Sequence, residues 1–200
     1  MFRKLLGAKG VHFLVTRFGS EKLRRVAFDD KYRRGVWAFD GDSSGELPEV
    51  VKRYLRKGDL LVLGCGRASV LDGLRDAELN SVLGVDLSGE AIRLAGRHAS
   101  SKVRFEIANM ETFTCAGRYD EILFSESLYY VPARKQLRAL FRLASCLKPD
   151  GVFIVTLAEA ARYQDIIVKI RANFRMLEDR AFSDSPRHLL VFQPCDAHAE

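Results

Sequence analysis

Two glycines flank a single cysteine directly after a run of apolar residues, in the sequence LLVLGCGRAS at residues 60–69. Four consecutive apolar residues are typical of a strand that is buried on both faces of a sheet. Gly64 and Gly66 allow a sharp turn and let a ligand approach the peptide groups without meeting a Cβ atom. A helical pattern follows and directs its free N–H groups towards the turn. The pattern favours a nucleotide site, although a glycine turn can also serve only to pack a helix on a strand.

A carboxylate ends the next apolar run, because Asp86 closes the sequence VLGVD at residues 82–86. At the end of the second strand of a nucleotide-binding sheet, an acidic residue is in position to bind the hydroxyl groups of a ribose. A carboxylate that faces a core needs polar partners. We therefore interpret Asp86 as a binding residue.

The elements that must position these residues alternate along the chain and predict a doubly wound, Rossmann-like α/β sheet. Strands are expected near residues 60–63, 82–86, 103–107, 120–124 and 152–157, and helices near 47–55, 68–79, 89–99, 133–147 and 158–172. Two strand-like runs at 174–182 and 189–193 are joined by turn-forming residues and predict an antiparallel hairpin at the edge of the sheet. Ligands of such sheets bind at the carboxyl ends of the strands.

The chain has 200 residues, 48% of them apolar, which fits one domain over residues 1–200. Residues 45–200 are expected to form the sheet and its helices. Residues 1–30 are expected to be helical with a break near Gly19 and Ser20, and residues 31–44 to be a loop. Residues 1–14 lack the apolar core of a signal peptide and no stretch has the length of a membrane span, so we expect a cytoplasmic protein.

The four cysteines are widely spaced and no two have the spacing of metal ligands. They are Cys65, Cys115, Cys146 and Cys195. We therefore expect reduced thiols, no disulfide framework and no metal site.

The net charge of +6 is concentrated near the start of the chain, where residues 1–57 hold 14 Lys and Arg against 7 Asp and Glu. Clustered basic residues attract nucleic acids or acidic small substrates. A solvated helical face explains the same pattern and is the interpretation that we favour.

Five ordered blocks of the sequence resemble class I S-adenosylmethionine-dependent methyltransferases, from about residue 31 to residue 193. These blocks are LLVLGCGRAS, VLGVDLS, FEIANMETF, YDEILFSESLYYV and LKPDGVFIV. The resemblance implies a seven-stranded sheet, mostly parallel with an antiparallel final strand, and S-adenosyl-L-methionine as cofactor. SESLYYV and KYRRGVW are similar to segments of small-molecule methyltransferases, including bacterial N-methyltransferases that act on modified chitooligosaccharides.

The resemblance also implies which residues hold the cofactor. Gly64, Cys65 and Gly66 would lie against its methionyl part, and Asp86 would bind both ribose hydroxyls. The adenine would contact Leu87, Asn109 and Met110, and Ser125 would face the methyl donor. The alternatives are that Leu87 and Met110 are core residues, that Asn109 is a turn residue and that Ser125 caps the following helix.

Three positions depart from the family pattern. Val62 stands where the family usually carries an acid that helps to hold the methionyl amine, which leaves the cofactor's ammonium to other groups. Ala68 replaces a third glycine, and one methyl group there is expected only to tighten the approach of the helix. Asn109 replaces an aspartate but still presents an oxygen to the adenine amino group.

The acceptor side is expected to follow the fourth strand, where Glu126 and Tyr129 are the candidate catalytic residues. Glu126 could accept a proton from an amine or a hydroxyl group. Tyr130, Tyr32 and Trp37 are the candidate substrate-binding residues, because residues 1–44 are the part of the chain left to cover the cofactor as a lid. The alternatives are that these side chains orient the substrate or pack in the core.

We expect methyl transfer to an N or O atom of a small-molecule acceptor. The alternatives are an RNA or protein methyltransferase, with nucleic acid less favoured, or a non-catalytic module that binds the cofactor or a partner. A dinucleotide oxidoreductase is disfavoured because Ser69 stands where its third glycine or alanine belongs.

Overall fold

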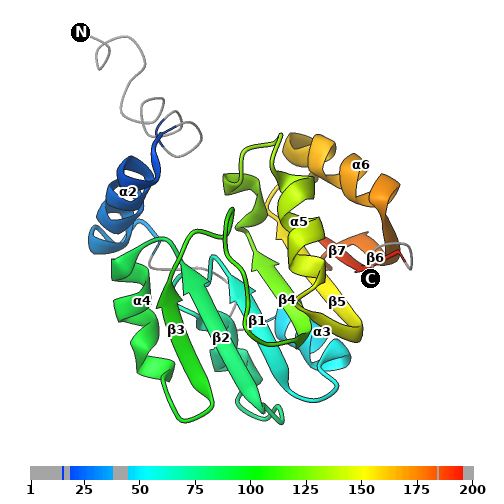
Figure 1. The fold of residues 1–200 in the computed structure, drawn as a ribbon, viewed down its shortest axis with the longest axis horizontal. Helices are drawn as coiled ribbons and strands as arrows, with labels where there is room; N and C mark the ends of the chain where they lie inside the picture. Colours follow the sequence, from blue (N-terminus) through cyan, green and yellow to red (C-terminus); the bar gives the residue numbers. More distant parts are fainter. Residues whose placement is uncertain (1–14, 16–18, 38–44, 184, 196–200) are drawn as a thin grey trace, which may run out of the picture.

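The computed structural model describes residues 15, 19–37, 45–183 and 185–195. A seven-stranded sheet with the order β3-β2-β1-β4-β5-β7-β6 runs through the molecule (Figure 1). The strands are β1 (Asp59–Leu63), β2 (Ser81–Asp86), β3 (Val103–Ile107), β4 (Tyr119–Ser125), β5 (Leu147–Leu157), β6 (Phe174–Ala181) and β7 (His188–Pro194). The first five are parallel, and β7 runs antiparallel to both β5 and β6. The predicted fold is confirmed, including the reversed strand.

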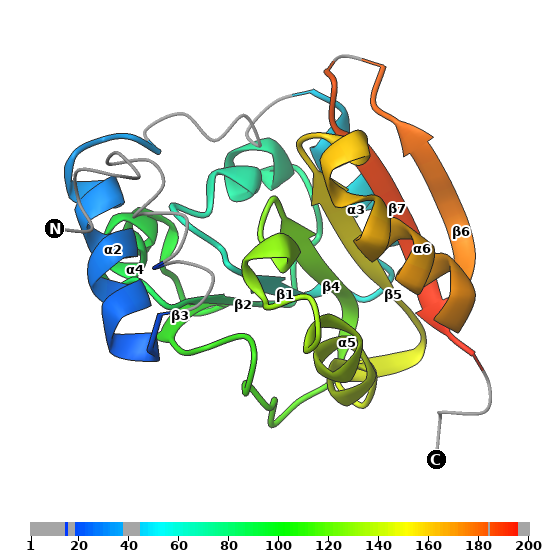
Figure 2. The same ribbon diagram turned by 90° about the horizontal axis from the view of Figure 1, so that it is seen from above.

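Helices cover both faces of the sheet (Figure 2). On one face lie α3 (Glu46–Tyr54), the 3₁₀ helix η1 (Ser69–Leu74) and α4 (Gly89–Ala95), and on the other lie α5 (Gln136–Ala144) and α6 (Gln164–Asn173). Successive strand residues point to opposite faces, so Leu61 and Leu63 pack in the α5 and α6 core while Leu60 and Val62 pack in the α3 core. This two-sided burial explains why the strands are continuous apolar runs.

The segment after β1 is shorter than expected. The helix predicted over residues 68–79 is a 3₁₀ helix of six residues, η1, which begins after Ala68 in a left-handed conformation with φ of 56°. Gly73 lies inside this segment and disfavours a longer α-helix. The side chain of Ala68 therefore makes this left-handed backbone conformation less favourable than a glycine would. Its expected effect on the approach of a long helix does not arise, because no long helix follows.

The bounds of three other helices differ from the expected ones. α4 ends at Ala95 and is followed by a short 3₁₀ helix, η2 (Gly96–His98). α5 begins at Gln136, after the turn that follows Pro132, and a 3₁₀ helix, η4 (Ala160–Tyr163), precedes α6.

The N-terminal helix that the structure describes is α2 (Glu21–Arg33), which starts where the sequence predicted a break. The hydroxyl of Ser20 caps it by accepting a hydrogen bond from Leu23 N at 3.4 Å. The helix continues through residues 31–33, which were expected to be loop, and the remainder of the predicted N-terminal segment, residues 1–14, 16–18 and 38–44, lies outside the described residues. α2 lies beside α4 (Figure 1).

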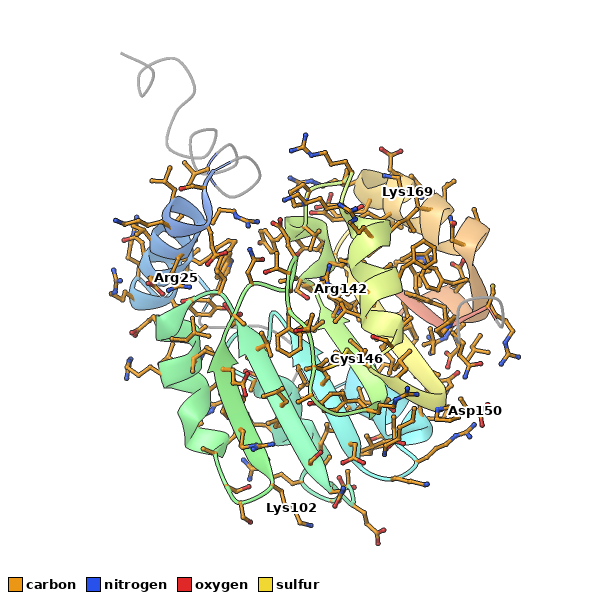
Figure 3. All side chains as sticks on the ribbon, in the orientation of Figure 1. Arg25, Lys102, Arg142, Cys146, Asp150 and Lys169 are labelled. Carbon is orange, nitrogen blue, oxygen red and sulfur yellow. A yellow bond between two sulfur atoms is a disulfide. The ribbon has the colours of Figure 1, made fainter. Side chains whose placement is uncertain are left out.

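Two cysteines form a disulfide, so the expectation of four reduced thiols is wrong for Cys115 and Cys146. Cys115 lies on the loop after β3 and Cys146 follows α5 (Figure 3), 31 residues further on. Folding brings them to a Cα–Cα distance of 6.0 Å, which their spacing in sequence does not reveal. Arg142 on α5 holds the same loop by donating to the carbonyl oxygens of Met110 and Phe113.

One acidic side chain lies in the core without a polar partner. Glu121 on β4 is fully buried, and neither of its carboxylate oxygens has a hydrogen-bond partner among the described residues. Burial raises the pKa of Glu121 well above its ordinary value, and the neighbouring Asp120 adds to this effect. The buried position therefore favours the neutral form of this side chain.

Candidate active site

The glycine turn after β1 has the conformation that the sequence predicted. Gly64 and Gly66 have φ angles of 70° and 54°, in the left-handed region that favours glycine. The turn is held against β2, because the N–H groups of Gly64 and Cys65 both donate to the carbonyl oxygen of Val85, at 2.8 and 3.0 Å. A Cβ atom at Gly64 would lie 2.5 Å from Cβ of Ser127, so no other residue fits there.

Asp86 at the end of β2 is a buried carboxylate with backbone partners. One oxygen accepts from Gly66 N at 3.0 Å and the other from Ser88 N at 2.8 Å. Burial raises the pKa of Asp86 to about 6, although these hydrogen bonds act in the opposite direction. The group is therefore mostly ionised at neutral pH, and a carboxylate with two hydrogen bonds keeps further acceptor positions for a ligand.

A cavity of about 590 Å³ lies beside these two features, at the carboxyl ends of β1, β2 and β4. This is the point where the strand order reverses between β1 and β4, the expected ligand position in such a sheet. The predicted site residues that line it are Gly64, Cys65, Gly66, Asp86, Leu87, Met110, Ser125, Glu126, Tyr129, Tyr130, Tyr32 and Trp37. The fold thus brings the predicted glycine turn, acid and aromatic residues to one cavity, and their individual roles stay predictions.

Asn109 is the one predicted site residue that is not among the residues lining the cavity. Its amide nitrogen donates to Glu21 at 3.0 Å, and its amide oxygen accepts from Glu111 N at 3.0 Å. These contacts place Asn109 in a turn that also touches α2.

Val62, which the resemblance placed beside the methionyl amine, also lines the cavity. The lining residues that were not predicted are Phe28, Gly45, Ser69, Val70, Ser127, Ser185 and Arg187. Phe28 could have been found, because it lies four residues before Tyr32 and therefore on the same helix face. No sequence signal points to Arg187, which reaches the cavity from the turn between β6 and β7.

Aromatic side chains from α2 and from the segment after β4 form one wall of the cavity. The ring of Phe28 lies 5.4 Å from Tyr130 and 5.7 Å from Trp37, between centroids. Tyr32 lies 5.1 Å from Trp37, and its hydroxyl group is next to Gly66. Beyond Tyr130, Tyr129 stacks on Tyr163 with centroids 4.4 Å apart. The wall can contact planar or apolar parts of a ligand and exclude water from it.

Glu126 is the acidic residue on the aromatic side of the cavity. It has a φ of 50°, and its N–H group donates to Oγ1 of Thr156 at 3.1 Å, which fixes the chain at the end of β4. The Tyr129 hydroxyl donates to its carboxylate at 3.4 Å. Burial raises the pKa of Tyr129 and raises that of Tyr130 to about 12, so both phenols stay protonated at neutral pH. Glu126 is thus the lining residue on this side that can accept a proton.

Buried polar contacts hold α2 in this position. Arg24 forms an ion pair with Glu111, and Lys135 contacts the same carboxylate at 2.8 Å. Burial alone would raise the pKa of Glu111, but the hydrogen bonds from Lys135 and Arg24 lower it below its ordinary value. Nearer the end of α2, Asp29 accepts from the hydroxyl of Ser88, two residues after Asp86, at 2.6 Å.

The described residues contain no group of three or more His, Cys, Asp or Glu side chains that could hold a metal ion. None of the helices in this part of the chain is long and apolar enough to cross a membrane.

Comparison with known proteins gives one family match and many structural neighbours. Residues 60–151 match the model of a family described as a methyltransferase domain. An uncharacterized protein of Methanocaldococcus jannaschii is 27% identical over 133 residues, which are 66% of this chain and 50% of that protein. The chain therefore spans about half the length of this curated relative.

Three of the similar solved structures are methyltransferases by their descriptions. The putative methyltransferase of Haloferax volcanii, in complex with the Trm112 activator, has a TM-score of 0.68 at 17% identity, over 85% of this chain and 96% of that one. The N-methyltransferase NodS of Bradyrhizobium japonicum, bound to S-adenosylhomocysteine, has a TM-score of 0.63 at 18% identity. The match covers 84% of this chain and 98% of that one. A 1,6-didemethyltoxoflavin N1-methyltransferase of Burkholderia thailandensis, also bound to S-adenosylhomocysteine, has a TM-score of 0.65 at 20% identity, and the match covers 84% of each chain.

The strand order and the reversed β7 give this chain the fold of these methyltransferase structures. The match of residues 60–151 to a methyltransferase domain, and the S-adenosylhomocysteine bound in two of these structures, point to S-adenosylmethionine as the cofactor.

The residues present fit this cofactor. The bare glycine turn gives access to peptide groups, and the ionised, buried Asp86 suits a ribose diol. Leu87 and Met110 supply apolar surface for an adenine on the same side of the cavity. The departure is Val62, which lines the cavity without offering a charge to the cofactor's ammonium.

Proposed function

We propose that this protein transfers a methyl group from S-adenosylmethionine to an N or O atom of a small-molecule acceptor. The observation that carries the proposal is that one cavity joins the glycine turn and Asp86 to a wall of aromatic side chains from α2 and the end of β4. Because α2 is held over this cavity by the buried ion pair of Arg24 with Glu111, the space for an acceptor is bounded. Such a bounded space suits a metabolite better than a macromolecule.

The protein's contribution to the reaction is mainly positioning. When bound, the cofactor supplies an electrophilic methyl group on its sulfonium. The glycine turn holds the methionyl part and Asp86 the ribose, while Tyr130 and Trp37 exclude water and orient the acceptor. Holding two reactants in the right geometry can contribute on the order of 7–11 kcal/mol to lowering a barrier. Glu126 accepts the proton that an attacking amine or hydroxyl group loses, and the Tyr129 hydroxyl fixes the carboxylate for this task.

The test uses S-adenosylmethionine that carries an isotopic label in its methyl group. The purified protein is incubated with this cofactor and a cell extract, and the products are separated into small molecules, RNA and protein before mass spectrometry. We expect a labelled small molecule that is absent when Asp86→Asn replaces the unchanged protein. The absence of label from all three fractions would contradict the proposal and favour a binding module without chemistry.

A macromolecular acceptor is the second candidate. Its motive is the surplus of Lys and Arg over residues 1–57. Within this segment Arg25, Arg33 and Arg34 have exposed side chains, each paired with an acidic residue. In the labelling experiment this candidate predicts label in RNA or protein, with binding that weakens steeply as salt is added in the case of RNA.

A further inference from the structure

The lining of the cavity contains a basic side chain and lacks the acid that the family pattern implies on β1. Val62, which stands in place of that acid, lines the cavity and offers no carboxylate. Among the described residues that line the cavity, Arg187 is the only one with a basic side chain. Arg187 is therefore the lining residue suited to an anionic group.

The turn between β6 and β7 fixes the position of Arg187. The N–H group of Phe182 donates to the carbonyl oxygen of Arg187 at 2.9 Å and closes the turn. The guanidinium carbon lies 4.6 Å from the centroid of the Phe182 ring, and Nε donates to the Ser185 hydroxyl at 3.1 Å. These contacts orient a side chain that would otherwise be flexible.

The same turn is attached to the helix in front of β1. Glu46, the first residue of α3, accepts from both the N–H and the hydroxyl of Ser183, each at 2.9 Å. In Figure 2 the tip of the β6–β7 hairpin lies next to the start of α3. Leu189 and Val191, which follow Arg187 at a spacing of two, pack in the same core as Val62. Arg187 thus belongs to the Val62 face of the sheet.

We propose that Arg187 binds the carboxylate of the cofactor's methionyl part. This contact takes the place of the contact between an acid on β1 and the cofactor's ammonium, which Val62 cannot make. A guanidinium group is planar and matches a carboxylate with two parallel N–H donors. The resemblance places the methionyl part against the glycine turn, and Arg187 lines the same cavity as Gly64 and Gly66. This inference rests on the proposed function, because it assigns a residue to the binding of the same cofactor.

The experiment compares two ligands that differ in this group. S-adenosylhomocysteine carries the methionyl-type carboxylate and ammonium, whereas 5′-methylthioadenosine has the same nucleoside without them. Their dissociation constants are measured by calorimetry for the unchanged protein and for Arg187→Met, Arg187→Lys and Arg175→Met. Arg175 is the matched control, because it lies on the same hairpin, contacts Gln193 and does not line the cavity.

We expect Arg187→Met to weaken binding of S-adenosylhomocysteine on the order of 10- to 100-fold and to leave 5′-methylthioadenosine unchanged. Arg187→Lys should give an intermediate loss, since it keeps the charge without the planar fork, and Arg175→Met should change neither ligand. An unchanged affinity of Arg187→Met for S-adenosylhomocysteine, or equal losses for both ligands, would overturn the inference. The ligand without the carboxylate also reports whether the variant is folded.

The binding and labelling results together distinguish failure of the proposed function from failure of the assignment of Arg187. If the unchanged protein binds neither compound, both proposals are overturned. If it binds S-adenosylhomocysteine through Arg187 but labels no acceptor, the carboxylate site stands and the methyl transfer does not.

Discussion

The two halves of the cavity are built in different ways. The half that we propose for the cofactor, called the cofactor half, is defined by Gly64, Cys65, Gly66, Asp86 and Leu87. It comes from one short stretch of chain and presents backbone groups and one carboxylate. The acceptor half, defined by Phe28, Tyr32, Trp37, Glu126, Tyr129 and Tyr130, presents side chains from segments about 100 residues apart in sequence. The first half depends on local backbone conformation. The second depends on how α2 is attached to the sheet, and four experiments can separate the two.

The largest effect is expected from the disulfide, which holds the loop that carries Met110 next to the cofactor half. Closing a loop over a sequence separation of 31 residues restricts the unfolded chain by about 3–4 kcal/mol. Reduction with dithiothreitol should therefore lower the free energy of unfolding by about this amount, measured in guanidinium chloride. A Cys115→Ala, Cys146→Ala double variant is the control and should not respond to the reductant. If the unchanged protein and the double variant lost the same free energy of unfolding on addition of dithiothreitol, the disulfide would not be the cause of that loss.

Glu111→Gln should disturb the acceptor half, because it leaves Arg24 buried without its carboxylate partner. Breaking a buried ion pair in this way costs about 3 kcal/mol. We expect reduced stability and a raised KM for the acceptor, while the dissociation constant of S-adenosylhomocysteine changes less than about 3-fold because its main partners do not lie on α2. Asp30→Asn, which removes an exposed ion pair with Arg34 on the same helix, should have almost no effect. A larger loss of cofactor affinity than of acceptor affinity would show that the halves are not separable.

Asp86→Asn should disturb the cofactor half and weaken binding of S-adenosylhomocysteine by about 1.5–3 kcal/mol, the range for hydrogen bonds to a charged group. The pH dependence follows from the pKa of Asp86, which is raised from 3.8 to about 6. Affinity of the unchanged protein should fall as the pH decreases through 6, because the protonated acid loses acceptor positions. The variant should show no such change in calorimetry, and Glu126→Gln, in the acceptor half, should retain it.

The raised pKa of Asp86 also determines how this group's contribution to folding stability changes with pH. A carboxyl group whose pKa is higher in the folded protein than in the unfolded chain favours folding when it is protonated. The contribution of Asp86 to stability therefore decreases as the pH rises from about 4 to about 6.

The smallest effect is expected at Glu126, where the left-handed backbone conformation is unfavourable for an L-residue. Glu126→Gly should raise the free energy of unfolding by about 1 kcal/mol and still lower turnover, since the carboxylate is lost. Glu126→Gln should lower turnover without the gain in stability. Asp150→Gly, at an exposed position with φ of 63° outside the cavity, is the control for the backbone effect alone. Full turnover of Glu126→Gln would remove this residue from the mechanism.

The difference between local and long-range contacts also decides which parts of the cavity could be predicted from the sequence. The turn at Gly64 and the position of Asp86 follow from residue types at fixed spacing, and both are found where they were expected. Asn109 carries the same kind of local signal, but its amide nitrogen donates to Glu21, which only the docking of α2 brings near. Its amide oxygen accepts from Glu111 N within the same turn. Arg187 was missed because its position depends on a hairpin turn at the far end of the chain. Cys115 and Cys146 were misjudged for the same reason, since only the packing of α5 brings them together.

Glu121 makes the folding of this chain a reaction that takes up a proton. In the unfolded chain a glutamate is ionised at neutral pH, whereas burial raises the pKa of Glu121 in the folded protein well above that ordinary value. Folding therefore takes up protons at Glu121 in the pH range between its ordinary pKa and its raised one, and raising the pH through that range favours the unfolded chain. In that range the heat released on refolding should depend on the ionisation enthalpy of the buffer, and Glu121→Gln should reduce this dependence.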